Sequence, residues 1–230
     1  ERLKRKYLDE ITSDPETFSI CTDTIVRQVG EIGRMVSEFS SFARMPEPTM
    51  KPENLSEICR QSFYLERNRN PNFEYDIELP EDNVLIPCDS QQINQVLTNV
   101  LKNASESVTA RVDADGEDGE KGNIGLTLSE TGSNSSRETK IVIVDNGIGL
   151  PKEDRDRLAE PYVTTRTKGT GLGLAIVKKI MEDHTGDLIL EDGEVGGALV
   201  SLVFHPGSNA QQLSTDDQES EETELNAHGT

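Results

Sequence analysis

The sequence has little of several residue types, and each shortage excludes a class of protein. It contains no tryptophan, and its hydrophobic content is 33% over 230 residues. This amount suits one medium-sized domain with a solvated part rather than a chain that is core throughout. The three cysteines lack Cys-x-x-Cys spacing. A disulfide framework and a cysteine-ligated zinc site are therefore not expected. We expect the chain to reside in a reducing compartment, the cytoplasm.

Long apolar runs and clusters of basic residues are also missing. The longest purely aliphatic run is IVIV at 141–144, far shorter than a membrane span, and no signal peptide is recognised. We expect no membrane contact from this chain. The formal net charge is −20 at pH 7. Because nucleic-acid backbones are bound by clustered lysine and arginine, a nucleic-acid partner is not expected either.

Acidic residues are concentrated in two segments. Residues 113–120 carry five acids, and residues 207–230 carry six acids with no lysine or arginine. Such blocks repel themselves, so 207–230 is predicted to be a disordered acidic tail. The chain starts without methionine, inside a charged helical pattern, and we interpret it as a fragment of a longer protein.

Residues 1–45 have the pattern of a helical hairpin. Apolar residues recur alternately four and three positions apart along a narrow seam, formed by Ile25, Val29, Ile32, Val36, Phe39 and Ala43. The prolines of MPEP at 45–48 end this helix. We expect the seam to pack against the helices of a second copy of the chain, which would make a homodimer. A helix docked on its own domain is the alternative.

Residues 46–206 mix helical and strand patterns without the regular alternation of a doubly wound parallel sheet. One expected helix begins at the capping box NLSE (54–57), and two others cover 90–108 and 171–183. The expected strands are 73–79, 84–88, 124–128, 140–145, 188–191 and 198–204. This order predicts an α+β fold, a two-layer α/β sandwich in which helices cover one face of a mixed sheet.

The helix predicted at 90–108 carries polar side chains beside its apolar stripe. Asn99 and Asn103 are four positions apart, with Gln92 and Glu106 in the same sector. Amides at the rim of a core-facing helix can be directed into a cleft. Simple solvation of the two asparagines is the alternative.

A strand that ends in an acid precedes the first of two glycine-rich segments. In IVIVDNGIGLP, Asp145 closes the strand, and Gly147 and Gly149 follow. The acid is either the start of an Asx turn or an acceptor at the floor of a pocket, where it reads an amino group of a ligand.

The second glycine-rich segment is KGTGLGLAIVKK at 168–179. Leu174 stands where a dinucleotide-binding Gly-x-Gly-x-x-Gly motif has its third glycine, and no phosphate-loop motif precedes a helix. The glycines still present free N–H groups at a helix N-terminus, which suits an anion. Residues 150–168 contain five lysines and arginines, so we predict a basic lid between the two segments, closing over a negative ligand.

In this order, the segments resemble the ATP-binding domain of sensor histidine kinases, a branch of the gyrase-type ATPase superfamily with the Bergerat-type fold. QVLTNVLKNASES is similar to the N box, VDNGIGL to the first glycine box, EPYVTT to the phenylalanine box, and GTGLGLAIVKKIMEDHTG to the second glycine box. This resemblance covers about residues 50–206. Residues 1–45 resemble the later part of the dimerisation and phosphoacceptor hairpin, and FSSFARMPEP is similar to the helix end in nitrogen-regulation kinases of the NtrY type.

The resemblance implies ATP and Mg²⁺ as ligands. Asp145 would accept from the adenine amino group, Asn103 would ligate Mg²⁺, and Asn99 would support the phosphate–metal site. The two asparagines are thus the implied catalytic residues. The implied ATP-binding residues are Asn99, Asn103, Asp145, Gly147, Gly149, Tyr162, Thr165, Arg166, Lys168, Gly169, Thr170, Gly171, Leu172 and Gly173.

Two departures from the family pattern bear on the reaction. Gyrase-type hydrolases have a glutamate where this chain has Asn99, so transfer to a protein group is favoured over hydrolysis. None of His184, His205 and His228 matches the phosphoacceptor motif, and His184 is interpreted as a helix cap. The acceptor histidine is therefore expected upstream of Glu1.

The expected protein is the catalytic region of a sensor histidine kinase. It would phosphorylate a histidine of the dimerisation helix, and the phosphoryl group would pass to an aspartate of a response-regulator receiver domain. The fragment alone is not expected to autophosphorylate. The alternatives are a non-catalytic module for dimerisation and nucleotide sensing, and a gyrase-type ATP hydrolase.

Overall fold

The computed structural model describes residues 2–8, 13–116, 119–132, 137–153, 155–164, 169–194 and 196–205. Its helices are α1 (Arg2–Tyr7), α2 (Pro15–Ala43), α3 (Leu55–Arg69), α4 (Ser90–Asp115) and α5 (Gly173–Asp183), with a short 3-10 helix at Arg155–Arg157. Its strands are β1 (Lys51–Asn54), β2 (Glu74–Glu78), β3 (Leu85–Cys88), β4 (Asn123–Thr131), β5 (Glu138–Asp145), β6 (Gly186–Asp192) and β7 (Ala198–Phe204). The predicted acidic tail lies outside the described residues.

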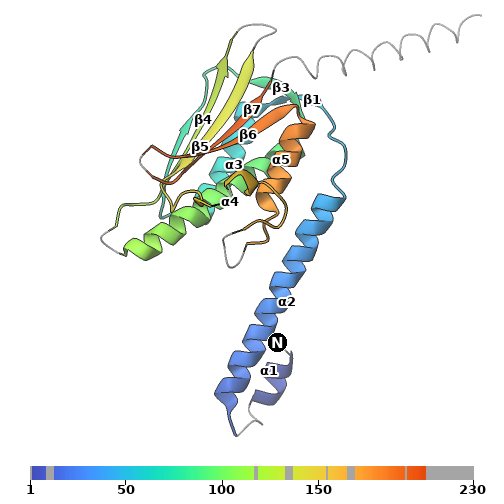
Figure 1. Cartoon of the computed structure of the whole chain (residues 1–230), viewed down its shortest axis with the longest axis vertical. Coiled ribbons are helices and arrows are strands. Elements are labelled where there is room, and N and C mark those ends of the chain that lie inside the picture. Colours follow the sequence, from blue (N-terminus) through green and yellow to red (C-terminus); the bar gives the residue numbers. More distant parts are fainter. Residues whose placement is uncertain are drawn as a thin grey trace, which may run out of the picture.

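The larger sheet is mixed, with the strand order β2-β4-β5-β7-β6. Strands β2 and β4 run parallel, and the remaining neighbours are antiparallel. Strands β1 and β3 form a separate antiparallel pair. Helices α3, α4 and α5 lie together over one face of the larger sheet (Figure 1). The predicted α+β sandwich is therefore confirmed.

The core lies between this sheet and the helices. Side chains alternate along the central strands, so that one face of β4 and β5 is buried, at Ile124, Leu126, Leu128, Ile141 and Ile143. The apolar stripe of α4 faces them, with Ile93, Val96, Leu97, Val100 and Leu101 each at most 1% exposed. Burial of this stripe fixes the rotation of α4 about its axis. It therefore decides which polar residues of α4 stand at the border of the core.

Several elements are longer or shorter than the sequence predicts, among them β4, which spans nine residues, and three further differences have a clear cause. Helix α4 continues to Asp115 because Val112 packs against the core and Arg111 pairs with Asp115 across one turn. Helix α5 begins at Gly173 rather than 171 because Gly171 has a φ of +70°, outside the helical region. Strand β1 is not predicted by its sequence, KPEN, because pairing with β3 and not side-chain alternation makes it a strand.

Helix α2 extends away from the sandwich (Figure 1). Its N-terminus is capped by Asp14, whose side chain accepts from the Thr17 N–H, and Pro15 occupies the first turn. The seam residues Ile25, Val29, Ile32, Val36 and Phe39 are between 48% and 63% exposed. The structure therefore does not support the alternative in which this helix packs along its own domain.

The segment after α2 is attached to the start of α4. The Thr49 N–H donates to Asp89 Oδ2 at 2.9 Å, and Gln92 Nε2 donates to the Pro46 carbonyl at 3.0 Å. Asp89 also caps α4 by accepting from the Gln91 and Gln92 N–H groups. Gln92 is 6% exposed and is used at this junction. Gln92 shares its sector of α4 with the asparagines, as predicted, but its amide is engaged by the Pro46 carbonyl.

Candidate functional site

The two asparagines of α4 lie at the border of the core. Asn99 and Asn103 are both half-buried and stand one helical turn apart. The next polar residue of the predicted row, Glu106, is exposed and faces Lys102 at 3.9 Å. The buried stripe of α4 thus turns the two amides, rather than Glu106, toward the neighbouring helix α5.

The N-terminus of α5 meets these asparagines. A β carbon placed on Gly173 would lie 3.9 Å from Asn99 Oδ1 and 4.0 Å from Asn103 Nδ2. Leu172, the residue before the helix, is 1% exposed and gives no side-chain cap. The first N–H groups of a helix have no partner within it, and they carry partial positive charge. The tertiary fold therefore combines the second glycine segment and the asparagine pair into one polar, anion-compatible surface.

The carboxylate of Asp145 is buried where β5 ends. Asp145 is 5% exposed, and its Oδ1 accepts from the Gly147 N–H at 2.8 Å. This hydrogen bond is the Asx turn that the sequence offered as an alternative, and it accounts for one carboxylate oxygen. On the other side, Gly197 lies directly against the Asp145 carbonyl, and Gly149 lies against the Gly197 carbonyl. The acid is thus held in place from two directions.

Tyr162 and Gly171 close the segment between the glycine boxes. The Tyr162 N–H donates to the Gly171 carbonyl at 3.0 Å, and a β carbon on Gly171 would lie 2.6 Å from the Tyr162 carbonyl carbon. Tyr162 has a φ of +67° and is 63% exposed. This backbone contact leaves no room for a side chain at position 171, which explains the glycine there.

The basic character of the lid is weaker than its sequence suggests. Arg155 forms a bidentate pair with Asp192 of β6, at 2.6 and 3.0 Å, and this pair raises the pKa of Arg155. Arg157 pairs with Glu160 at 3.0 Å. Thr165, Arg166 and Lys168 lie outside the described residues. Gly169 and Thr170 are half-buried, and Thr170 Oγ1 accepts from the Leu172 N–H at 3.4 Å.

His184 ends helix α5 and has a structural role. It is 2% exposed, its Nδ1 donates to the Ile180 carbonyl at 2.8 Å, and its Nε2 accepts from the Asp89 N–H at 3.0 Å. Burial lowers the pKa of His184, although the Ile180 carbonyl and the nearby Asp89 oppose this shift. The capping interpretation of His184 is confirmed. His205 is exposed and pairs with Asp187 at 2.7 Å, and His228 lies outside the described residues.

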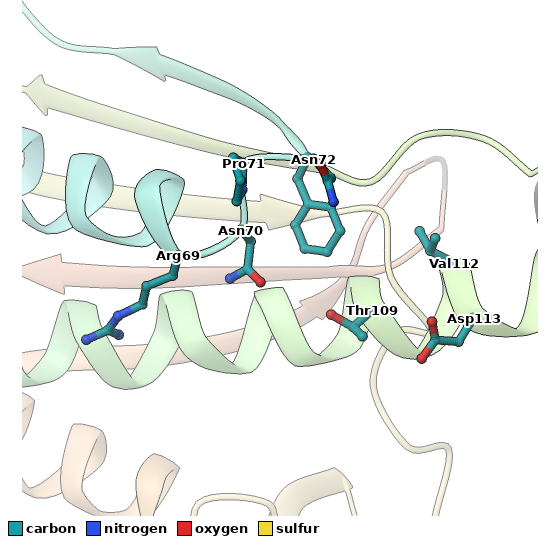
Figure 2. A pocket seen from close by; sticks show the side chains of 8 residues that line it. Arg69, Asn70, Pro71, Asn72, Thr109, Val112 and Asp113 are labelled. Carbon is teal, nitrogen blue, oxygen red and sulfur yellow. The ribbon is translucent and has the colours of Figure 1, made fainter.

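A cavity of about 300 Å³ lies elsewhere along α4, between this helix and the turn that follows α3 (Figure 2). It is lined by Arg69, Asn70, Pro71, Asn72, Phe73, Thr109, Val112 and Asp113, none of which belongs to the predicted site. Asn70 is occupied locally, since its Nδ2 donates to Glu66 Oε1 and to Ser105 Oγ. This cavity is therefore a gap between α3 and α4, separate from the asparagine pair.

Two contributors to the site are missing from the sequence interpretation. Gly197 lies in the turn before β7, and its contact with Asp145 depends on the pairing of β5 with β7. Ser107 packs against Gly147 through its hydroxyl. Its spacing gives a signal, because Asn99, Asn103 and Ser107 follow one another every four residues along α4.

Comparison with known proteins gives the family. Residues 88–208 match the family described as histidine kinase-, DNA gyrase B-, and HSP90-like ATPase. The nitrogen regulation protein NtrY of Azorhizobium caulinodans is 50% identical over 208 residues, which are 89% of this chain and 26% of that protein. The solved catalytic domain of histidine kinase ThkA is 28% identical, with a TM-score of 0.56 over 69% of this chain and 96% of that one.

A further solved structure, of ThkA in complex with the response regulator protein TrrA, has a TM-score of 0.63 at 21% identity. It covers 89% of this chain and 57% of that one, and the likeness shows the fold. The chain therefore belongs to the histidine kinase-, DNA gyrase B- and HSP90-like ATPase family. Within it, the similarity is to sensor histidine kinases of the NtrY type, as the motifs predict.

The chain spans about a quarter of the length of the NtrY protein that it matches. Among the helices of the described residues, none is both long enough and apolar enough to cross a bilayer.

Proposed function

We propose that this chain binds Mg-ATP and supplies the catalytic ATP-binding region of a sensor histidine kinase. The observation that carries the proposal is the meeting of the α5 N-terminus at Gly173 with Asn99 and Asn103, while Asp145 is buried at the end of β5. A nucleotide with an amino-bearing base and a phosphate chain requires both features, an anion-compatible surface and a buried acceptor, and their presence supports the proposal.

ATP would be held by backbone at its phosphates and by Asp145 at its base. The N–H groups that begin α5 would receive the phosphates, and the glycines at 169, 171 and 173 let the backbone approach them. Asp145 would accept from the adenine amino group, whereas guanine, with a carbonyl at that position, would place a second acceptor against the carboxylate. Gly147 and Gly149 would shape the base site. The proposed binding set is completed by Tyr162, Thr165, Arg166, Lys168, Thr170 and Leu172.

Mg²⁺ fits the chemistry of the asparagine pair. The described residues contain no group of three or more His, Cys, Asp or Glu side chains that could hold a metal ion. A hard cation that takes one amide oxygen from Asn103 and its other ligands from phosphate and water needs no such group. When bound, the ion would neutralise charge on the phosphates, and Asn99 would support the phosphate–metal site beside it.

The proposed reaction is transfer of the γ-phosphoryl group to a histidine outside these residues, and then to a response-regulator aspartate. The position of Asn99 lacks a carboxylate that could activate water, which favours transfer over hydrolysis. His184 is buried and holds both ring nitrogens in hydrogen bonds, so it is not the acceptor. A histidine kinase of the same fold, ThkA, was solved with the response regulator TrrA, which supports a receiver domain as the partner.

Calorimetric titration of ATP with Mg²⁺ tests the binding site. Asp145→Asn and Asn103→Ala should each weaken binding by about tenfold or more, because each removes a partner of a buried or charged group. Asn68→Ala, at an exposed asparagine of α3, is the matched control and should bind as the unchanged chain does. Absence of ATP binding by the unchanged chain would favour the alternative of a non-catalytic module.

Incubation with γ-labelled ATP tests the reaction. The chain alone should stay unlabelled, and a parent protein containing the acceptor histidine should acquire an acid-labile label that Asn103→Ala abolishes. Stable labelling of His184 would contradict the assignment. Steady release of phosphate by the chain alone would instead favour the gyrase-type hydrolase.

We also propose that residues 1–45 form a homodimer through the seam of α2. The exposed seam leaves large apolar side chains in water, and its alternate spacing of four and three residues suits packing against another helix. Sedimentation should give the mass of a dimer. Val29→Glu should shift the chain toward the monomer, whereas Arg27→Glu, on the opposite side of α2, should not. A monomeric unchanged chain would refute this proposal.

A further inference from the structure

Ser107 of α4 has a buried hydroxyl that finds no partner among the described residues. The residue is 4% exposed, and its Oγ makes no hydrogen bond to any residue that the structure describes. A buried hydroxyl without a partner is unfavourable, so such groups are uncommon in folded proteins and need an explanation. A ligand that supplies the missing hydrogen bond is one explanation, and the position of Ser107 supports it.

Ser107 continues the row of the asparagine pair. It follows Asn103 by four residues and Asn99 by eight, so the three side chains lie along one side of α4. The asparagines stand at the proposed phosphate end of the site, where α5 begins. Ser107 lies further along the same row, at the end where the first glycine segment crosses α4.

Gly147 brings Ser107 and Asp145 together. A β carbon on Gly147 would lie 2.2 Å from Ser107 Oγ, and the Ile148 N–H donates to the Ser107 carbonyl at 3.3 Å. The N–H of the same glycine donates to Asp145 Oδ1 at 2.8 Å. The serine hydroxyl and the aspartate carboxylate therefore flank a single glycine that has no side chain to separate them.

A hydroxyl on a helix often turns back to the carbonyl four residues earlier. In this chain Thr109 does so, with its Oγ1 donating to the Ser105 carbonyl at 2.8 Å, and Thr22 donates to the Phe18 carbonyl at 2.8 Å. Ser107 makes no such bond. The hydroxyl of Ser107 is therefore not explained by the local helix geometry that explains the two threonines.

We propose that Ser107 is a second base-reading residue of the ATP site, and this inference rests on the proposed function. The amino group of adenine is a donor, and the ring nitrogen beside it, N1, is an acceptor. A carboxylate can only accept, so Asp145 serves the amino group and cannot serve N1. The Ser107 hydroxyl donates to N1, directly or through one water, and so completes recognition of this edge of the base.

The test is calorimetric binding of ATP and of 1-deaza-ATP, in which carbon replaces N1, to the full chain with Mg²⁺. Ser107→Ala should weaken ATP binding about threefold to tenfold, the range for one neutral hydrogen bond. The unchanged chain should lose a similar factor on 1-deaza-ATP. The variant should lose nothing further on the analogue, because the bond is then already absent.

Ser105→Ala is the matched control, since Ser105 is also a buried serine of α4 but has a partner in Asn70. This variant should lower the melting temperature and leave ATP affinity unchanged. Ser107→Ala should not lower the melting temperature, because it removes a buried hydroxyl that has no partner in the part of the chain that the structure describes.

Two different failures are distinguishable. If the unchanged chain binds ATP and Asp145→Asn weakens it, but Ser107→Ala binds ATP as tightly as the unchanged chain, the inference about Ser107 is wrong and the proposed function stands. The inference about Ser107 is also wrong if replacing ATP by 1-deaza-ATP weakens binding by the same factor in Ser107→Ala and in the unchanged chain. If the unchanged chain does not bind ATP, both are overturned.

Discussion

The turn before β7 offers two adjacent glycines with different surroundings. Gly196 and Gly197 both have positive φ, of +98° and +74°. A β carbon on Gly196 would meet nothing within 4 Å, whereas one on Gly197 would overlap the carbonyl oxygen of Asp145. Alanine at either position therefore has the unfavourable positive φ. Only alanine at 197 also collides with Asp145, the residue proposed to read the base.

The magnitudes separate the two variants. Gly196→Ala should lower the free energy of unfolding by about 1–2 kcal/mol, the cost of a left-handed conformation for a residue with a β carbon. Gly197→Ala should lower it by a further 1–3 kcal/mol or so, because the overlap is with backbone in the sheet and cannot be relieved by a side-chain rotation.

Urea denaturation measures both changes, and ATP titration measures their effect on the site. Only Gly197→Ala should weaken ATP binding, because only this substitution displaces Asp145. Equal stabilities for the two variants would refute the packing argument. Unchanged ATP affinity in a folded Gly197→Ala variant would refute the link between this turn and the base site.

Three further predictions concern the rest of the domain. Asp89→Ala should lower the free energy of unfolding by about 1–2 kcal/mol in urea denaturation, through loss of the α4 cap and the bond from Thr49; an unchanged midpoint would contradict this. Because burial lowers the pKa of His184 in the folded chain, the unfolded chain binds its proton more readily, so the stability contributed by His184 is present above pH 6.5 and falls as pH drops below it. His184→Gln should reduce this pH dependence of the melting temperature, and an identical profile would refute the assignment. A thiol reagent should label the exposed Cys21 and spare Cys59 and Cys88 until the chain unfolds, since burial raises the pKa of each of these two to about 12; rapid native labelling of all three would contradict this burial.

The order of the elements could be predicted because it follows from local patterns. Alternating apolar residues predict β4 and β5, and the apolar stripe predicts α4 and its rotation. The resemblance of the ordered motifs to the family predicts a nucleotide site that contains Asp145 and the later glycine segment, and this assignment stays a prediction. These features depend on neighbours within a few positions along the chain.

Gln92 shows the limit of this reasoning. Its angle about the α4 axis is close to that of the asparagines, and the sequence therefore grouped them. Periodicity gives that angle, but it does not say what packs opposite each turn of the helix. The segment after α2 lies at the first turn of α4 and engages Gln92 through the Pro46 carbonyl, so the proposed nucleotide-binding side chains begin only at Asn99.

The sequence by itself determined most of the secondary structure, the mixed sandwich and the residue types of the candidate site, because hydrophobic periodicity and glycine spacing are local. Only the tertiary structure placed Gly173 beside Asn99 and Asn103, set Gly197 against Asp145, and left the Ser107 hydroxyl buried next to Gly147. Each of these contacts joins elements that are far apart in the chain. They depend on how strands pair and helices pack, which no local pattern specifies.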